Sequence, residues 1–564
     1  MLKKPRSRFL VMSFSALAVL LMLLSACGGG GATTGTTPTT GGGTPVKGGT
    51  WIDDLFEEPD SLIPNASNET FAAMMMYGLY APMIYSTPAG QIKAGLVTQV
   101  PSASNGGISA DLKTWTFTFK PGLKWSDGQA LDARDMDFTW KLWKNPKFGA
   151  ITTIAVSDIT SADVSADNLT ITFHLKDPLV SFYNYFTDGY YGPLPAHHFA
   201  IMDPAAILKS ADNLNPSVTS GPFMMSESKP TDHYTMVKNP MYYQAPNLPY
   251  LDKVIFRITP DQNTILKDLQ AGTPDSSWFL NVAEALVYAS LSNYTVDAPK
   301  NTGNFEALYF DFHNKVLANN PEVRQAMAMA VDQQTLIDVA RRGLGGRLCV
   351  DHAPTQIPGH FTGTCPKFDL TAANALLDSH GWVKDATSGI RSKGGQKLEF
   401  QYSTTANNLW RADDELINQQ NFKKIGIKLD IQNYPASTLF GTFLFDGKPG
   451  VYDIVEYETA VGIDPDDAAF FQTGNPGNTT YYSNPALDAL YKQEQGTADP
   501  AARQAAFDKI HQIYLTDFPM IVEFASPDIG IHKKGTENYQ QSLVGAGEDP
   551  NIWLWWCDGG TCPA

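Results

Sequence analysis

One segment near the N-terminus fixes where folded structure can begin. Residues 28–49 read GGGGATTGTTPTTGGGTPVKGG and contain almost no apolar side chains. A segment of this composition buries too little surface to offset the entropy that a chain loses when it becomes ordered. We therefore expect a flexible tether that spans roughly 25 Å on average, with a globular body after it.

The residues before this tether have the features of an export signal. Lys3, Lys4, Arg6 and Arg8 form a basic start, and the apolar run 9–24 follows. A basic start, a short apolar run and small residues are typical of a secretory signal peptide, and about 16 residues are few for a membrane span. We therefore predict that residues 1–26 are a cleaved signal peptide.

The end of the apolar run resembles the lipobox of bacterial lipoproteins. Its four residues are Leu24-Ser25-Ala26-Cys27. The resemblance implies cleavage just before Cys27 and acylation of the Cys27 sulfur, so that residues 27–47 are a lipidated cysteine and a disordered tether. We expect an exported protein that is lipid-anchored to the outer face of the cell membrane, which is the periplasmic side where an outer membrane exists. The alternative is an ordinary signal peptide with an incidental cysteine.

Charge and length limit the class of protein. The formal net charge of −17 includes the four cations of residues 1–26, so the rest of the chain carries about −21. An acidic chain is poorly suited to nucleic acid or to anionic lipid. The roughly 538 residues after the signal are enough for more than one domain.

Aromatic residues are plentiful. The 11 Trp, 23 Tyr and 30 Phe supply a core and also suit a cleft that binds ligands through aromatic rings.

Four cysteines follow Cys27, and export permits disulfides. Cys349 and Cys365 enclose one loop, and Cys557 and Cys562 enclose another near the C-terminus. Four cysteines allow three connectivities, of which we favour the two local pairs. A zinc site would need tighter pairs or nearby histidines, so we expect neither a metal nor a cofactor.

A clear strand pattern occurs at residues 115–119. Trp115, Phe117 and Phe119 alternate with polar residues, which predicts a strand with one buried face. Pro121-Gly122 ends this strand, and Ser126-Asp127-Gly128 makes a second turn.

Three aspartates follow that turn. Asp132 stands where a helix N-cap belongs, and Asp135 falls in the first turn of the predicted helix. Together with Asp137 they could instead be metal ligands. On a helix, however, Asp137 does not share a face with the other two, so capping explains these residues better.

The same region carries a family resemblance. WTFTFKPGLKWSDGQALDARDMDFTW (115–140) resembles the characteristic segment of the extracellular solute-binding proteins of family 5, the oligopeptide and dipeptide class that serves ATP-driven importers. Further segments that resemble the family follow in the expected order and cover nearly all of residues 48–530. They are TSGPFMMSESKPTDHYTMVKNPMYY (219–243), YLDKVIFRITPDQNTILKDLQAGTPD (250–275), NNPEVRQAMAMAVDQQTLIDVARRGLG (319–345), FKKIGIKLDIQ (422–432) and YSNPALDALYKQ (482–493).

The resemblance implies an α/β fold of the periplasmic-binding-protein type II class, with two lobes around a hinge and two subdomains in the larger lobe. It places domain I in residues 48–72, 212–304 and 522–564, domain II in 73–211 and domain III in 305–521. By the same analogy, hinge strands are expected near Phe305–Phe312 and Pro519–Phe524.

The resemblance also points to ligand-binding positions. In peptide binders of the family, an aspartate four residues before the proline that matches Pro465 holds the α-amine of the peptide. Val461 stands there in this chain, so the pattern is broken. Asp464 stands just before the proline, and Glu456 and Glu458 lie nearby and could replace the missing aspartate. Trp278 and Trp410 would suit a sugar ring or an apolar side chain, with core packing as the alternative. The predicted ligand-binding residues are Asp60, Ser61, Leu62, Trp278, Tyr402, Thr404, Asn407, Trp410, Glu456, Tyr457, Glu458, Val461 and Asp464.

We therefore expect a monomeric receptor without enzymatic activity. It would capture a peptide-like solute in a cleft between the lobes and deliver it to the permease and ATPase of an ABC transporter. The sequence contains no Gly-x-Ser-x-Gly elbow, no His-Glu-x-x-His and no phosphate-binding loop. The alternatives are a same-fold binding protein for oligosaccharides or a metal chelate, a receptor that senses peptides without importing them, and a secreted hydrolase.

Overall fold

The computed structural model describes residues 44–557, apart from 68, 89, 152–153, 188, 299–302, 351–358, 362, 407, 436–437, 445–449, 461, 476, 527 and 542–550. The predicted signal peptide, Cys27 and most of the tether lie outside the described residues, as do Asn407, Val461 and Cys562. Within the part that is described, we find no helix long and apolar enough to cross a membrane.

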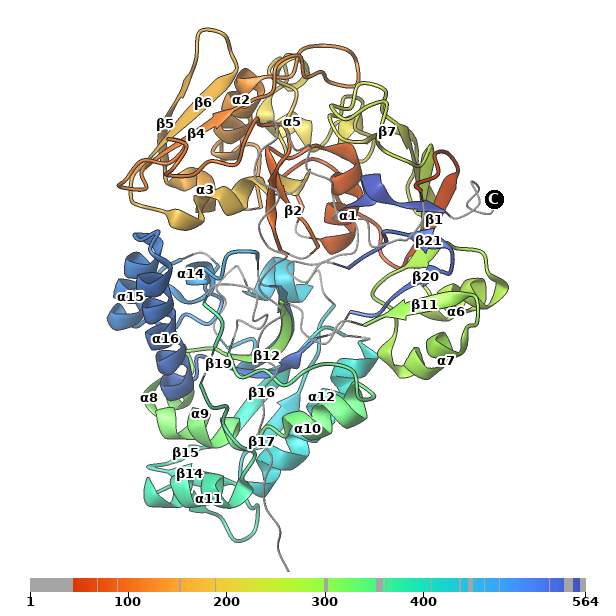
Figure 1. Cartoon of the computed structure of the whole chain (residues 1–564). Helices are drawn as coiled ribbons and strands as arrows, with labels where there is room; N and C mark the ends of the chain where they lie inside the picture. The colour runs from red at the N-terminus through yellow and green to blue at the C-terminus, as the bar shows by residue number, and fades with distance from the viewer. Residues whose placement is uncertain are drawn as a thin grey trace, which may run out of the picture. The chain divides into compact units, whose positions relative to one another are not determined.

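The largest sheet has seven strands in the order β11-β20-β10-β1-β9-β8-β7 (Figure 1). Its central strand β1 pairs in parallel with β9 and β10, whereas β8 and β7 extend the sheet as antiparallel neighbours. The strands are β1 (Thr50–Leu55), β7 (Phe223–Lys229), β8 (His233–Lys238), β9 (Lys253–Ile258), β10 (Ser276–Ser277), β11 (Tyr294–Asp297) and β20 (Gly530–Lys533).

A second sheet has five strands in the order β17-β16-β18-β12-β19. The first three strands of this order run parallel, and β12 pairs antiparallel with both β18 and the edge strand β19. The strands are β12 (Asn304–Phe310), β16 (Glu399–Ser403), β17 (Lys428–Ile431), β18 (Ile454–Ala460) and β19 (Met520–Ala525). The chain passes from β11 to β12 and later from β19 to β20, so β12 and β19 connect this sheet to the seven-stranded one.

A third, antiparallel sheet consists of β4 (Thr114–Thr118), β6 (Thr170–Leu175) and β5 (Ile159–Val164). The strand predicted from alternating aromatics is confirmed, because Trp115, Phe117 and Phe119 are all buried. The predicted N-cap is also confirmed. Asp132 accepts a hydrogen bond from the Arg134 backbone at the start of α2 (Ala133–Trp143), and Asp135 completes a capping box.

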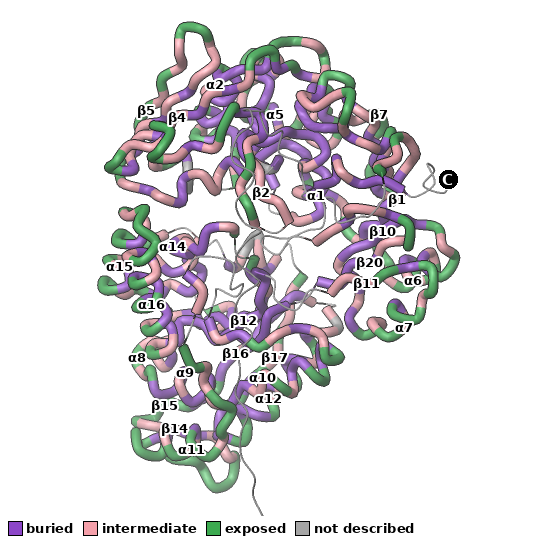
Figure 2. Tube along the Cα trace, viewed as in Figure 1, coloured by how far each residue is buried: buried purple, intermediate pink, exposed green. Residues whose placement is uncertain are grey.

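Different helices cover the two faces of the five-stranded sheet (Figure 1), and its strand β12 is buried (Figure 2). On β12, Leu308 and Phe310 pack with α9, α11 and α12, whereas Ala307 and Tyr309 pack with α14, α15 and α16 on the opposite face. This alternation is what a strand buried on both faces requires. The helices are α9 (Pro321–Ala328), α11 (Leu370–Ser379), α12 (Leu409–Lys424), α14 (Ala468–Phe471), α15 (Pro485–Gln495) and α16 (Pro500–Asp517).

The seven-stranded and three-stranded sheets share one large core. It joins α1 (Thr70–Leu79) to the aromatic side chains of both sheets and to Trp553 and Trp555 near the C-terminus. A separate small core lies under α6 (Gln262–Ala271) and α7 (Ala285–Ser290). Most tryptophans are therefore structural. The domain boundaries expected from the resemblance stay predictions.

The local disulfide between Cys349 and Cys365 is present, with Cα atoms 5.3 Å apart. Cys557 is also disulfide-bonded, and its expected partner Cys562 lies outside the described residues. Among the described residues we find no cluster of histidine, cysteine and carboxylate side chains with the geometry of a metal site.

Candidate ligand-binding site

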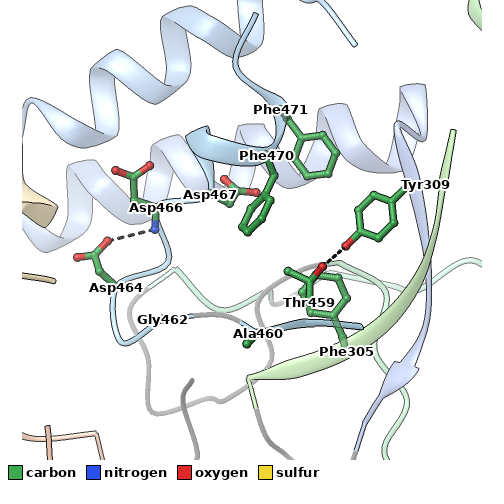
Figure 3. A pocket seen from close by; sticks show the side chains of 10 residues that line it. All are labelled: Phe305, Tyr309, Thr459, Ala460, Gly462, Asp464, Asp466, Asp467, Phe470 and Phe471. Carbon is green, nitrogen blue, oxygen red and sulfur yellow. Dashed lines mark hydrogen bonds between the residues drawn. The ribbon is translucent and has the colours of Figure 1, made fainter. Parts of the chain in front are cut away.

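A small cavity lies between β12, the end of β18 and α14 (Figure 3). Its volume is about 30 Å³, which is room for one or two water molecules. Aromatic side chains form one wall, namely Phe305, Tyr309, Phe470 and Phe471. Thr459, Ala460, Gly462 and three aspartates line the rest. Much of this lining comes from the end of β18 and the residues that follow it, and of the described residues predicted to bind ligand, Asp464 lines the cavity.

The aromatic wall is fixed by contacts behind it. The rings of Tyr309 and Tyr457 stack with their centroids 4.2 Å apart and an interplanar angle of 11°. The Tyr309 and Thr459 hydroxyls hydrogen-bond at 2.5 Å, and the Tyr457 hydroxyl lies 3.0 Å from that of Thr479. Tyr457, a predicted ligand contact, thus supports the wall from within the core.

Asp464 is buried and already has a cationic partner. Arg503, in the first turn of α16, donates to the Asp464 carboxylate with an Nη1–Oδ2 distance of 2.7 Å, and to Glu494 with an Nε–Oε2 distance of 2.9 Å. Burial raises the pKa of Glu494 to about 10, so Glu494 is protonated at neutral pH and the charged pair is Arg503 with Asp464. Asp464 therefore does not offer an unpaired charge to the amine of a ligand.

The two following aspartates are also engaged by the protein. Asp466 accepts hydrogen bonds from the Gln495 amide and from the Ala468 backbone. Asp467 accepts one from the Tyr514 hydroxyl. Burial raises the pKa of Asp466. The Asp464–Asp467 loop is thus anchored to α14, α15 and α16, which keeps it at the edge of the cavity.

Two hydrogen bonds join this loop to the lobe that contains the three-stranded sheet. They come from the 3₁₀ helix η1 (Val180–Phe186), whose Phe182 and Phe186 pack in the core of that lobe. The Ser181 hydroxyl donates to Asp466 Oδ2 at 2.8 Å, and the Tyr183 hydroxyl donates to Asp464 Oδ2 at 3.0 Å. We term these two hydrogen bonds the η1 bridge. It connects segments that belong to separate hydrophobic cores.

A second group of predicted residues lies in a polar layer between α12 and the five-stranded sheet. Tyr402 is fully buried, and its hydroxyl donates to the Glu456 carboxylate. The Thr404 hydroxyl donates to the Glu456 backbone carbonyl at 2.8 Å. The structure therefore brings Tyr402, Thr404 and Glu456 together, but α12 covers them and they do not line the cavity.

This layer contains six carboxylates and two arginines. Arg411 Nε donates to Glu306 Oε1 at 2.9 Å, and Arg341 pairs with Asp414 at 2.9 Å. We define the carboxylate layer as Glu306, Asp414, Glu456, Glu458, Glu523 and Asp528. Asn418 donates to Glu523 at 2.6 Å, and Asn304 donates to Asp528 at 2.8 Å.

Burial raises the pKa values of Asp414, Glu456, Glu458, Glu523 and Asp528. The pKa of Asp414 rises to about 7, and that of Glu458 rises to about 7 as well. The pKa values of Glu456, Glu523 and Asp528 rise well above the usual range for the same reason, with neighbouring carboxylates adding to the effect. Part of the layer is therefore protonated at neutral pH.

The remaining predicted residues lie elsewhere. The Ser61 hydroxyl donates to Asn213 at 2.7 Å, Leu62 is fully buried, and Asp60 is exposed. Trp278 packs against Phe71 in the large core. This is the core packing that was the alternative to a ligand contact for this residue. Trp410 packs against Phe279, which follows β10, with ring centroids 5.2 Å apart, and Arg341 lies 5.5 Å from the Trp410 ring. This contact connects α12 to the lobe of the seven-stranded sheet.

Sequence reasoning did not find the partners of the Asp464–Asp467 loop. Arg503 is 39 residues from Asp464, and Ser181 is 285 residues from Asp466. The acidic run 464–467 is the one local signal, because several carboxylates in a buried loop need donors. A single sequence does not say which donors supply them.

Comparisons with known proteins identify the family of this chain. The chain matches the model of the bacterial extracellular solute-binding proteins, family 5 Middle, over residues 98–482. It is 28% identical over 375 residues to a probable ABC transporter-binding protein of Deinococcus radiodurans, which is 60% of this chain and 61% of that protein. It is 25% identical over 481 residues to the oligopeptide-binding protein AppA of Bacillus subtilis, covering 84% of this chain and 86% of AppA.

Solved structures share the fold. AppA of Bacillus subtilis in complex with a nonapeptide superposes with a TM-score of 0.78 at 21% identity, covering 91% of this chain and all of AppA. NikZ of Campylobacter jejuni in complex with Ni(L-His) superposes with a TM-score of 0.76 at 20% identity, covering 90% of this chain and 99% of NikZ. The predicted α/β periplasmic-binding fold is therefore confirmed. The chain belongs to the bacterial extracellular solute-binding proteins of family 5, which bind solutes and do not transform them.

Proposed function

We propose that this protein is the substrate-binding component of an ABC importer and that it captures a peptide-like solute between its two lobes. The η1 bridge carries this proposal, because it joins the lobes beside an aromatic-walled cavity. A ligand that contacts both lobes stabilises such a closed arrangement, as in hinged receptors generally. The likeness to AppA, whose structure contains a nonapeptide, supports a peptide as the ligand.

The mode of peptide recognition would differ from the family pattern in one respect. Val461 occupies the position of the usual aspartate, and Asp464 is paired with Arg503. We infer that aromatic contacts from the half-buried Phe470 and hydrogen bonds to the peptide backbone supply most of the affinity. A dissociation constant of about 1 μM requires about 8 kcal/mol, which such contacts can provide without a buried ammonium.

Thermal unfolding in the presence of candidate ligands tests the proposal. Di-, tri- and nonapeptide mixtures, Ni(L-His) and oligosaccharides would each be added to the purified protein. A ligand at 100 times its dissociation constant stabilises the folded state by about 2.7 kcal/mol, so peptides should raise the melting temperature. A response to the nickel chelate alone, which the likeness to NikZ makes the main alternative, or to oligosaccharides alone would contradict the peptide proposal.

Uptake in cells separates import from sensing. Deletion of the gene should abolish uptake of the peptides that stabilise the protein. Unchanged uptake, with a lost cellular response to the same peptides, would instead favour a peptide sensor.

Removal of the η1 bridge should weaken ligand binding. We expect the double variant Ser181→Ala, Tyr183→Phe to bind its peptide about tenfold to thirtyfold more weakly, because the closed state loses two hydrogen bonds, each worth about 1 kcal/mol. Isothermal titration calorimetry measures the affinity, and small-angle X-ray scattering measures the closed fraction. The matched control is Ser109→Ala, Tyr85→Phe, which removes the same two hydroxyls elsewhere in the same lobe. Equal affinities for both double variants would show that the bridge does not support closure.

A further inference from the structure

A second, larger cavity lies at the outer edge of the five-stranded sheet. Its volume is about 320 Å³, which falls within the range of small-molecule sites. Its boundaries are the edge strand β19, the residues from the end of α9 to the start of α10, and the residues on either side of the Cys349–Cys365 disulfide. Helix α10 spans Gln333–Thr335. It shares no lining residue with the cavity beside the η1 bridge, so it is a separate feature of the fold.

The floor of this cavity is apolar. Val331, Phe518, Ile521 and Val522 line it, and each is less than a tenth exposed. Their side chains already belong to the cores on the two faces of the sheet. A ligand that reaches the floor would therefore need an apolar chain or ring, since a polar group there would lose its hydration without gaining a partner.

The mouth of the cavity is cationic. Arg347 and Lys367 line it and are exposed. Arg347 contacts the Gln333 side chain at 3.5 Å, and neither cation has a carboxylate partner among the described residues. Asp332 is the one carboxylate in the described lining, and it already accepts hydrogen bonds from the backbone and hydroxyl of Thr335 at 3.2 and 2.7 Å.

The Cys349–Cys365 disulfide places both cations at this opening. Arg347 stands two residues before Cys349, and Lys367 stands two residues after Cys365. The disulfide therefore brings them to the same place from opposite ends of a loop. Gln333 fixes the adjacent wall, because its amide donates to the Leu348 carbonyl at 2.5 Å and to the Val522 carbonyl at 2.9 Å.

We propose that this cavity is a second binding site, for a small molecule that joins one carboxylate to an apolar chain. The carboxylate would contact Arg347 and Lys367, since guanidinium and ammonium groups are the usual partners of carboxylates. The apolar chain would lie on Val331, Phe518 and Ile521. This site does not depend on the peptide proposal, because it involves none of the residues that line the first cavity.

Calorimetric titration with decanoate tests this site on the full-length protein. We expect saturable binding of one decanoate per chain with a dissociation constant below about 1 mM, and at least tenfold weaker binding of decanol, which lacks the charge. The double variant Arg347→Gln, Lys367→Gln should weaken decanoate binding at least tenfold. The matched control Arg342→Gln, Lys384→Gln removes the same two charges from exposed positions outside the cavity and should leave binding unchanged.

A cavity-filling variant locates the apolar end. Ala328 lines the cavity and is buried, so Ala328→Leu should reduce decanoate affinity while circular dichroism shows an unchanged fold. Peptides that fill the interlobe site should not displace decanoate. The proposal is overturned if decanoate binding does not saturate, if it is the same in the two charge variants, or if a peptide competes with it.

Discussion

The protein should unfold at a temperature about 5 °C higher at pH 5 than at pH 8. The reason is the carboxylate layer between α12 and the five-stranded sheet. Its carboxyl groups lose their hydration on folding, and two arginines face six carboxylates there. A folded state that binds protons more tightly than the unfolded chain is stabilised by acid.

The direction of the pKa shifts explains why the stability falls as the pH rises. Asp414 and Glu458 have pKa values of about 7 in the folded protein, whereas unfolded carboxyl groups titrate near pH 4. Between these two values the folded state retains protons that the unfolded state has lost. Each such group then lowers the free energy of unfolding by up to about 1.4 kcal/mol per pH unit as the pH rises. Glu69, in a separate group of carboxylates, adds to the slope because burial raises its pKa to about 7.

Other ionisable groups change the stability outside the range from pH 4 to pH 7. Hydrogen bonds to serine hydroxyls lower the pKa values of the exposed Asp111 and Asp167, so the stability that these two aspartates contribute is lost only when the pH falls below about 4. The stability should therefore be greatest near pH 4 and should decline on both sides. Melting temperatures recorded from pH 3 to pH 9 at constant ionic strength give the full profile.

One variant isolates the contribution of the layer. Glu458→Gln removes a carboxyl group whose pKa is about 7 in the folded protein. The decline in stability between pH 5 and pH 8 should therefore become shallower. The control Glu399→Gln removes an exposed carboxylate from the same sheet and should leave the slope unchanged. A melting temperature that is flat or rises from pH 5 to pH 8 in the wild-type protein would show that the layer does not control stability.

Local features of the fold could be predicted from the sequence because their causes lie close together in the chain. Asp132 and Asp135 complete a capping box within one helical turn. Pro321 begins α9 at the position where its missing N–H costs nothing. Gly272 ends α6 in the left-handed conformation, with φ of 75°, which glycine adopts without strain. The family resemblance then supplied the α/β class and the two lobes around a hinge.

The site was less predictable because its contacts join distant segments. Alternation along β18 places Glu456 and Glu458 on one face, but it does not say whether solvent or α12 covers that face. The structure shows that α12 covers Glu456 and that Tyr402 donates to it. Asp464 was expected near the ligand, and it does line the cavity. Its charge is nevertheless directed to Arg503, a partner that no local pattern indicates.

The pair of Arg503 and Asp464 gives the second large expected effect, a loss of stability when the arginine is replaced. Arg503→Met should lower the free energy of unfolding by about 3 to 5 kcal/mol, because it leaves the Asp464 carboxylate buried without its cation. Methionine keeps much of the side-chain volume, so lost charge rather than lost packing dominates. The control Arg134→Met breaks a pair with Asp132 in which the arginine side chain is 61% exposed, and exposed pairs contribute at most about 1 kcal/mol. Urea denaturation followed by tryptophan fluorescence measures both variants.

A double variant separates the charge from the rest of the arginine. Because Glu494 is protonated at neutral pH, the unpaired charge in Arg503→Met belongs to Asp464 alone. Adding Asp464→Asn should therefore restore at least about 1 kcal/mol, although the same change in the wild-type protein is destabilising. If Arg503→Met costs no more than Arg134→Met, Asp464 does not need its arginine. Its carboxylate would then be available to a ligand, and the family mode of binding a peptide amine would have to be reconsidered for this protein.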